Sequence, residues 1–146
     1  MTDIQSFDII DPRFQDENDP VGLRCPRVAE FPDVTPEMIS DGNPMVTNLE
    51  RITIKFGYPL SQPTTREFFH PGGFTCYDFF QAVHEGYVKI YAEEEQEVGN
   101  PGHIPGMLNR SVSHGPHGIW GHDIEDLFLE GFRESAPGCF VLGIGS

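Results

Sequence analysis

Proline spacing sets the strongest constraint on the N-terminal third of this chain. Six prolines occur within the first 48 residues, at positions 12, 20, 26, 32, 36 and 44. Because each proline lacks a backbone N–H donor and has a fixed φ angle, this spacing excludes long helices and central β-strands. Ten acids against three arginines leave the same segment with a net charge of −7. We therefore expect residues 1–48 to form an extended, acidic, proline-rich arm.

The arm also contains many isolated apolar residues, which solvated linkers rarely have. They suit an extended segment that places its side chains singly into grooves, on its own body or on a neighbouring chain. Prolines lower the entropy that such a segment loses when it becomes ordered. The alternative is a flexible N-terminal extension. We predict that the arm makes its interactions through Phe7, Ile9, Ile10, Phe14, Leu23, Phe31 and Met38.

The remaining residues, 49–146, have the patterns of a single α+β domain. Residues 49–56 alternate apolar and polar side chains, which predicts a strand, and residues 64–69 are expected to return beside it. Thr75 and Asp78 form a helix start signal, and apolar residues then recur every three or four positions, so we expect a helix over residues 76–96. Residues 127–132 and 139–144 are expected to form a second hairpin.

The order of hairpin, helix and hairpin resembles that of β-grasp domains. We therefore predict an α+β fold, a small roll with a mixed β-sheet packed on one main helix, plus the extended N-terminal arm. The run GIWGHDIEDLFLEG at residues 118–131, together with Gly73-Phe74-Thr75 before a tyrosine-containing helix, also resembles a family of small uncharacterised eukaryotic proteins. That resemblance covers residues 49–146 and implies one coherent domain without implying an activity.

Charge and composition restrict the classes of partner. The formal net charge of −14 repels phosphate backbones and anionic lipid surfaces. No stretch approaches the roughly 20 apolar residues of a membrane helix, and the first residues lack the character of a signal peptide. Three widely spaced cysteines, Cys25, Cys76 and Cys139, suit reduced thiols. We expect an intracellular, cytoplasmic protein that neither binds nucleic acid nor inserts into a membrane.

One cluster contains metal-ligating side chains: His114, His117, His122 and Asp123. Imidazole and carboxylate groups are ligands of zinc and non-haem iron. However, Gly115-Pro116 prevents the helical spacing that places two imidazoles on one face, and the cluster matches no standard metal signature. The alternative interpretation is that the histidines are exposed in a loop and that His122 and Asp123 close a turn, in which case no cofactor is needed.

The predicted helix suggests two further features. A thiol at Cys76, its first residue, would have its pKa lowered by the helix dipole, but His84 is about 12 Å along the helix and too distant to act as its base. We expect an inert, half-buried cysteine. Glu93-Glu94-Glu95 is expected to be a solvated helix end, where a cationic neighbour would relieve the unfavourable interaction with the dipole.

These observations favour a non-catalytic structural or protein-interaction subunit over an enzyme. The arm would dock onto a neighbouring chain, in a homo-oligomer or in a larger complex. The alternative is a small metal-dependent enzyme that uses Zn or Fe at the histidine cluster. A third hypothesis is a ligand-binding roll whose pocket is lined by aromatic residues: Phe68, Phe69, Tyr87, Tyr91 and Trp120.

Overall fold

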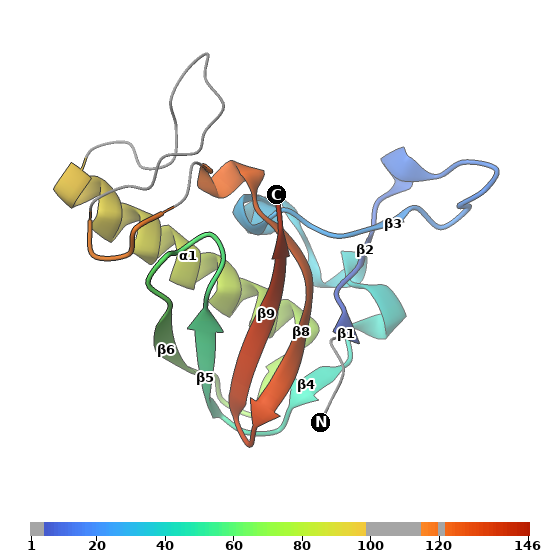
Figure 1. The fold of residues 1–146 in the computed structure, drawn as a ribbon. Helices are drawn as coiled ribbons and strands as arrows, with labels where there is room; N and C mark the ends of the chain where they lie inside the picture. The colour runs from blue at the N-terminus through green and yellow to red at the C-terminus, as the bar shows by residue number, and fades with distance from the viewer. Residues whose placement is uncertain (1–4, 99–114, 120–121) are drawn as a thin grey trace, which may run out of the picture.

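The structure is a computed structural model that describes residues 5–98, 115–119 and 122–146. Its main element is a five-stranded sheet in front of one helix (Figure 1). The strands have the order β1-β8-β9-β5-β6. Their bounds are Gln5–Ser6 for β1, Arg51–Phe56 for β5, Thr64–Phe69 for β6, Phe128–Ala136 for β8 and Cys139–Gly145 for β9. The helix, α1, spans Cys76–Val98.

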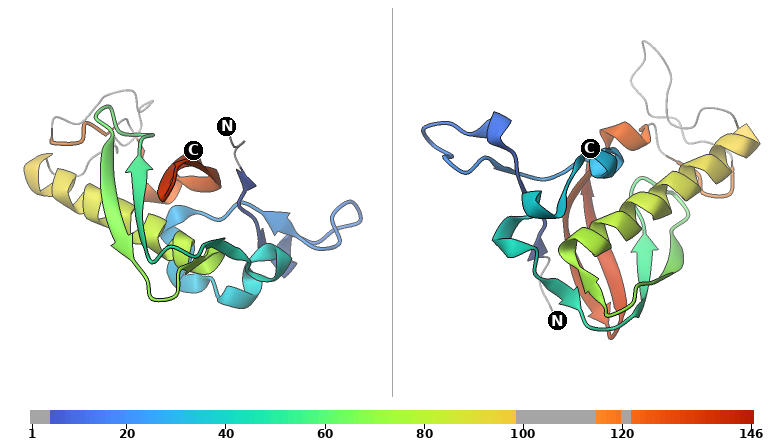
Figure 2. Two further views of the ribbon diagram at one scale, coloured as in Figure 1. Left: turned by 90° about the horizontal axis from the view of Figure 1, so that it is seen from below. Right: turned by 180° about the vertical axis from the view of Figure 1, so that it is seen from behind.

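The connectivity confirms the predicted α+β roll. β5 and β6 form one antiparallel hairpin, β8 and β9 form the other, and β5 runs parallel to β9 at the centre of the sheet. Helix α1 connects the two hairpins and covers one face of the sheet (Figure 2). Two hairpins joined through a helix, with their inner strands parallel, make the β-grasp arrangement.

Local sequence signals set the bounds of these elements. The Thr75 N–H donates to the Asp78 carboxylate at 3.0 Å and the Asp78 N–H donates to the Thr75 hydroxyl at 3.2 Å, so α1 begins at the predicted cap. The helix continues two residues past the predicted end. Strand β8 also extends beyond the predicted residue 132, because its backbone keeps pairing with β9 until the turn at Pro137-Gly138. Residues 133–136 lack apolar alternation, and the sequence therefore gives no local sign of this extension.

The arm folds back on its own body in short pieces. Strand β1 pairs with β8 at one edge of the main sheet, and β4 (Met45–Thr47) pairs with β7 (Phe74–Thr75). Strands β2 (Ile9–Ile10) and β3 (Leu23–Arg24) pair with each other. Four 3₁₀ turns lie at Pro12–Phe14, Val28–Asp33, Pro36–Met38 and Ser40–Gly42. As the prolines predict, the described part of the arm, residues 5–48, contains neither a long helix nor a central strand.

Arm and body share one hydrophobic core. The Phe7 ring lies 5.5 Å from that of Phe80 on α1 and 6.5 Å from that of Phe132 on β8. The other fully buried apolar residues of the arm are Ile9, Val28, Val34 and Ile39. Segment 5–48 therefore completes the core that α1 and the sheet begin. Among the described helices, none is both long and apolar enough to span a membrane.

Candidate functional site

The seven predicted interaction residues occupy three environments. Phe7 and Ile9 are buried within the chain's own core, and Ile10, Phe31 and Met38 are half-buried. Phe14 and Leu23 are exposed, and both belong to the hairpin that residues 9–24 form. We call residues 9–24 the arm hairpin. In Figures 1 and 2 the arm hairpin extends away from the body of the molecule.

Side-chain hydrogen bonds order the loop of the arm hairpin. The Asp19 carboxylate accepts from the backbone N–H groups of Val21, Gly22 and Leu23 at 3.2, 2.9 and 3.1 Å. The Asp16 carboxylate accepts from the N–H groups of residues 18 and 19 at 2.8 and 2.7 Å. Short acidic side chains fold loops in this way because they replace backbone hydrogen-bond partners. The loop therefore has a defined conformation, although it makes few contacts with the body.

Gly22 is required where the loop closes. Its φ angle is +79°, in the left-handed region that favours glycine, and a Cβ there would clash with the backbone carbonyl of Asp11. The Asp11 N–H in turn donates to the Gly22 carbonyl at 2.9 Å. Close approach of the two backbones thus sets the width of the arm hairpin.

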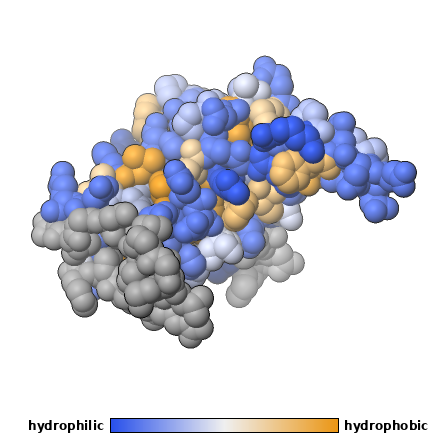
Figure 3. Space-filling view, turned by 90° about the horizontal axis from the view of Figure 1, so that it is seen from above, coloured by the Kyte–Doolittle hydropathy of each residue, from blue (hydrophilic) through white to orange (hydrophobic). Residues whose placement is uncertain are grey.

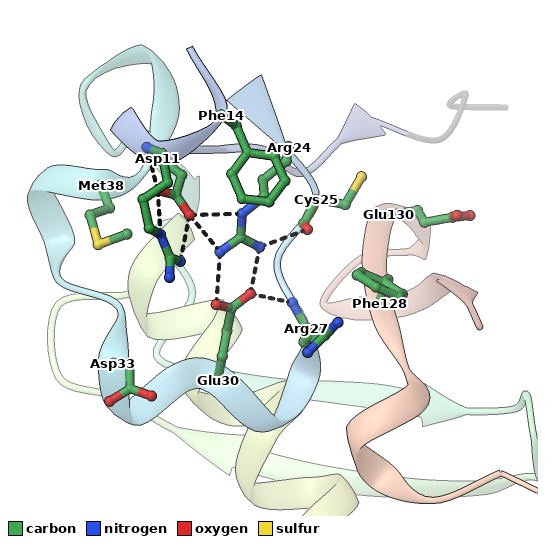
Figure 4. Close-up of a pocket in the computed structure, with 11 residues that line it drawn as sticks. Asp11, Phe14, Arg24, Cys25, Arg27, Glu30, Asp33, Met38, Phe128 and Glu130 are labelled. Carbon is green, nitrogen blue, oxygen red and sulfur yellow. Dashed lines mark hydrogen bonds and ion pairs between the residues drawn. The ribbon is translucent and has the colours of Figure 1, made fainter. Parts of the chain in front are cut away.

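A cluster of charged side chains fixes the base of the arm hairpin (Figure 4). Arg24 donates to the Asp11 carboxylate at 3.0 Å and to the two Glu30 oxygens at 2.7 and 2.9 Å. Arg13 donates to the same Asp11 carboxylate at 3.0 and 2.7 Å. Hydrogen bonds from Arg13, and then from Arg24, hold the pKa of Asp11 well below its usual range despite burial. Hydrogen bonds from Arg24 likewise lower the pKa of Glu30.

The charged cluster borders a pocket of about 950 Å³ between the arm and β8. Arg24 in its wall is already paired with two carboxylates, and its guanidinium carbon lies 5.0 Å from the centre of the Phe14 ring. The Cys25 thiol also lines the pocket, and burial, followed by the charges of Asp8 and Glu130, raises its pKa. A protonated thiol is a poor nucleophile, so this lining does not supply the groups for covalent catalysis.

The structure describes three of the four predicted metal-ligating residues. His114 lies outside the described residues. The His117 ring nitrogen Nε2 is 2.8 Å from the Glu93 carboxylate, whereas Nδ1 of His122 is 4.0 Å from Asp126. The Asp123 backbone begins the 3₁₀ turn Ile124–Asp126. Within the described part of the chain, no group of three or more His, Cys, Asp or Glu side chains could hold a metal ion.

The end of α1 corrects the expectation of a solvated acidic run. Glu94 is buried, and its carboxylate accepts from the N–H groups of Gly115, His117 and Gly118 at 3.0, 2.8 and 3.2 Å. The partners of Glu94 lie more than 20 residues away in the chain, so no local pattern in the sequence indicates its burial. Glu94 therefore holds residues 115–118 against the helix.

Glu93, next to Glu94, has a cationic neighbour of the kind expected to relieve its unfavourable interaction with the helix dipole. Arg66 on β6 donates to the Glu93 carboxylate at 2.6 and 3.2 Å. Hydrogen bonds from Arg66 and then His117 lower the pKa of Glu93 to about 2. The pair connects the edge strand of the sheet to the C-terminal part of α1.

Cys76, at the start of α1, is also half-buried. Burial raises its pKa to about 11, with a further contribution from the charge of Asp41. The expected half-burial is confirmed, and burial raises the pKa, opposite to the lowering expected from a helix dipole. Cys76 is therefore protonated at neutral pH.

Comparison with known proteins adds no relative to this description. Neither protein-family models nor curated proteins nor solved structures match the chain. The resemblance of residues 118–131 to a small eukaryotic family stays a prediction.

Proposed function

We propose that this protein is a non-catalytic interaction subunit that docks onto a neighbouring chain through the arm hairpin. The observation that carries the proposal is the exposure of Phe14, Val21 and Leu23, at 53%, 43% and 46%, on a projecting loop with a fixed backbone. An ordered loop loses little conformational entropy on binding. Burial of an apolar side chain against a partner contributes up to about 1.5–3 kcal/mol, so three such residues are a substantial anchor.

The rest of the arm supports this role indirectly. The buried residues Phe7 and Ile9 attach the arm to its own body, which leaves the far part of the hairpin, residues 12–22, directed outward. Val21 is not among the predicted interaction residues, but it is exposed on the same loop, so we include it in the docking surface. The net charge of −14 favours a protein partner over nucleic acid, and three free cysteines are consistent with a cytoplasmic location.

The alternative of a zinc or iron enzyme gains no support from the described residues. The His117 ring contacts Glu93 at 2.8 Å, and Nδ1 of His122 lies 4.0 Å from Asp126. Elemental analysis of the purified protein tests that alternative separately, because stoichiometric metal lost on substitution of both histidines would favour it.

The native mass of the full chain, purified alone and from its natural source, tests the docking proposal. A Phe14→Ser/Leu23→Ser variant should elute as a folded monomer where the unmodified chain forms an assembly. Val88→Ser is the matched control, because Val88 is a similarly exposed apolar residue on α1, away from the hairpin. If the double variant keeps the full assembly size, the arm hairpin is not the docking element.

A further inference from the structure

The sheet has a second face, opposite α1, that no described element covers (Figure 1). Strand β5 buries Ile52, Ile54 and Phe56, so the alternation along the strand directs Arg51 and Lys55 to this face. Across the sheet, Lys55 pairs in register with Val141, and Val141 pairs with Arg133. We call this surface the outer face and define it by Arg51, Lys55, Phe69 and Arg133.

Positive charge on the outer face is not neutralised within the described chain. Arg51, Lys55 and Arg133 form no ion pair with a described residue, and neither do Arg27 and Lys89, whereas Arg13, Arg24 and Arg66 pair with carboxylates. Strand geometry places Lys55 about 13 Å from Arg51 along β5 and about 10 Å from Arg133 across two strands. The alternation of β6 adds the acid Glu67 to the same face, and the Glu130 carboxylate of β8 lies over Gly145 at the end of β9. In a chain of net charge −14, this surface thus carries three cations that have no ion-pair partner among the described residues.

Apolar side chains accompany these cations. Phe69 is 61% exposed at the sheet edge and lies in register with Arg51. Leu49, just before β5, is also exposed. Between the cations, β9 presents the small residues Cys139, Val141 and Gly143, so the centre of the outer face has no large side chain. An exposed aromatic residue beside arginines is typical of protein-binding surfaces.

The tip of the arm hairpin carries charge opposite to that of the cations on the outer face. Its tip contains the acids Asp16, Glu17 and Asp19 beside the exposed apolar residues described above. The two arginines of the hairpin are paired with Asp11 and Glu30 at its base, so the tip itself is negative. Figure 3 shows a mixture of hydrophilic and hydrophobic residues on the surface seen from above. In one chain, the arm hairpin projects away from the outer face and leaves it open (Figures 1 and 2).

We infer that the arm hairpin of one copy docks on the outer face of a second copy, with its acidic tip against Arg51, Lys55 and Arg133 and its apolar residues against Phe69. This inference rests on the proposed function and names the partner as the chain itself. Because the hairpin and the outer face are different surfaces, the contact is made twice in a reciprocal two-fold dimer, or once between successive copies in a head-to-tail array. Opposite charges steer and orient the contact, so the association is sensitive to salt.

Complementation between two variants tests the inference. The variant Arg51→Glu/Lys55→Glu/Arg133→Glu reverses the positive charge of the outer face. The variant Phe14→Ser/Leu23→Ser removes two apolar side chains from the arm hairpin. In sedimentation velocity, each variant alone should be a monomer at concentrations where the unmodified chain self-associates. An equimolar mixture should form a heterodimer, because the first variant keeps its hairpin and the second keeps its outer face. Lys89→Glu, which changes an exposed cation on α1, is the control and should self-associate normally.

The outcomes separate this inference from the proposed function. If the outer-face variant associates like the unmodified chain while the hairpin variant does not, the hairpin docks elsewhere and only this inference fails. A mixture that stays monomeric, or association that is unchanged by raised ionic strength, also overturns it. An unmodified chain that is monomeric when purified but assembled in its source extract identifies a foreign partner, against this inference. A single Lys55→Glu substitution, expected to weaken self-association at least severalfold, replaces the triple variant if that variant does not fold.

Discussion

Arg24 donates a hydrogen bond of 3.0 Å to the Asp11 carboxylate, and this contact connects the two sides of the arm hairpin at its base. Asp11 is only 2% exposed, so its charge is compensated by arginines more than by water. The same Arg24 guanidinium binds Glu30 in the following 3₁₀ turn. The direction in which the hairpin leaves the body therefore depends strongly on one arginine.

Substitution of Arg24 should loosen the arm hairpin without unfolding the sheet. In Arg24→Gln, Asp11 keeps only Arg13 as an ionic partner and Glu30 loses both guanidinium hydrogen bonds. We expect faster amide hydrogen exchange and faster proteolysis within residues 12–22, with protection of β5 and β9 retained. Arg27→Gln is the control, because Arg27 is exposed and stacks on Phe128 at 5.5 Å. Equal exchange in the two variants would contradict the assigned role of Arg24.

Mild acid should lower stability through the paired carboxylates. The pKa values of Asp11 and Glu30 are below their usual values of 3.8 and 4.5 in the folded chain, so the unfolded chain binds more protons as pH falls. The contribution of these two carboxylates to the free energy of unfolding is therefore complete above about pH 5.5 and declines as the pH falls below about 5. Urea unfolding between pH 7 and pH 3 measures this decline. Asp11→Asn should be less stable at pH 7 and should show a shallower decline, and a slope equal to that of the unmodified chain would argue against the pairing.

Removal of the Phe7 ring should destabilise the whole protein. Phe7 packs against Phe80 and Phe132 in the shared core, and Phe7→Ala leaves a cavity there. We expect a loss of about 3–5 kcal/mol in the free energy of unfolding, measured in urea. Phe14→Ala, in the same arm but on the exposed loop, should cost less than about 1 kcal/mol. Similar values for the two variants would mean that the arm does not complete the core.

Neutralisation of Glu94 should release the segment that it holds. Glu94→Gln replaces one acceptor oxygen by an amide donor opposite the backbone N–H groups of Gly115, His117 and Gly118. We expect a loss of roughly 1–3 kcal/mol in the free energy of unfolding. Glu95→Gln, at the adjacent exposed position, removes the same charge and should change stability by less than about 0.5 kcal/mol. A matching loss in both variants would assign the effect to net charge in place of the buried hydrogen bonds.

Local patterns predicted the elements of the body well. The alternation of buried residues in β5 and the reciprocal hydrogen bonds of Thr75 and Asp78 depend on neighbours two or three positions apart, and such relationships are visible in a linear sequence. Local effects also predict the arm, because a proline restricts its own backbone independently of the tertiary structure. The extension of β8 to Ala136 escaped prediction because it depends on backbone pairing with β9.

The succession of hairpin, helix and hairpin, and the lack of long elements in the arm, follow from local sequence patterns. Three-dimensional packing determines which arm residues are buried, where Arg24 contacts Asp11 and Glu30, and that Glu94 binds a segment more than 20 residues away. It also decided that Lys55 and Arg133 share one face of the sheet. The physical reason is that these contacts arise from chain reversals and strand registers, which local periodicity does not encode.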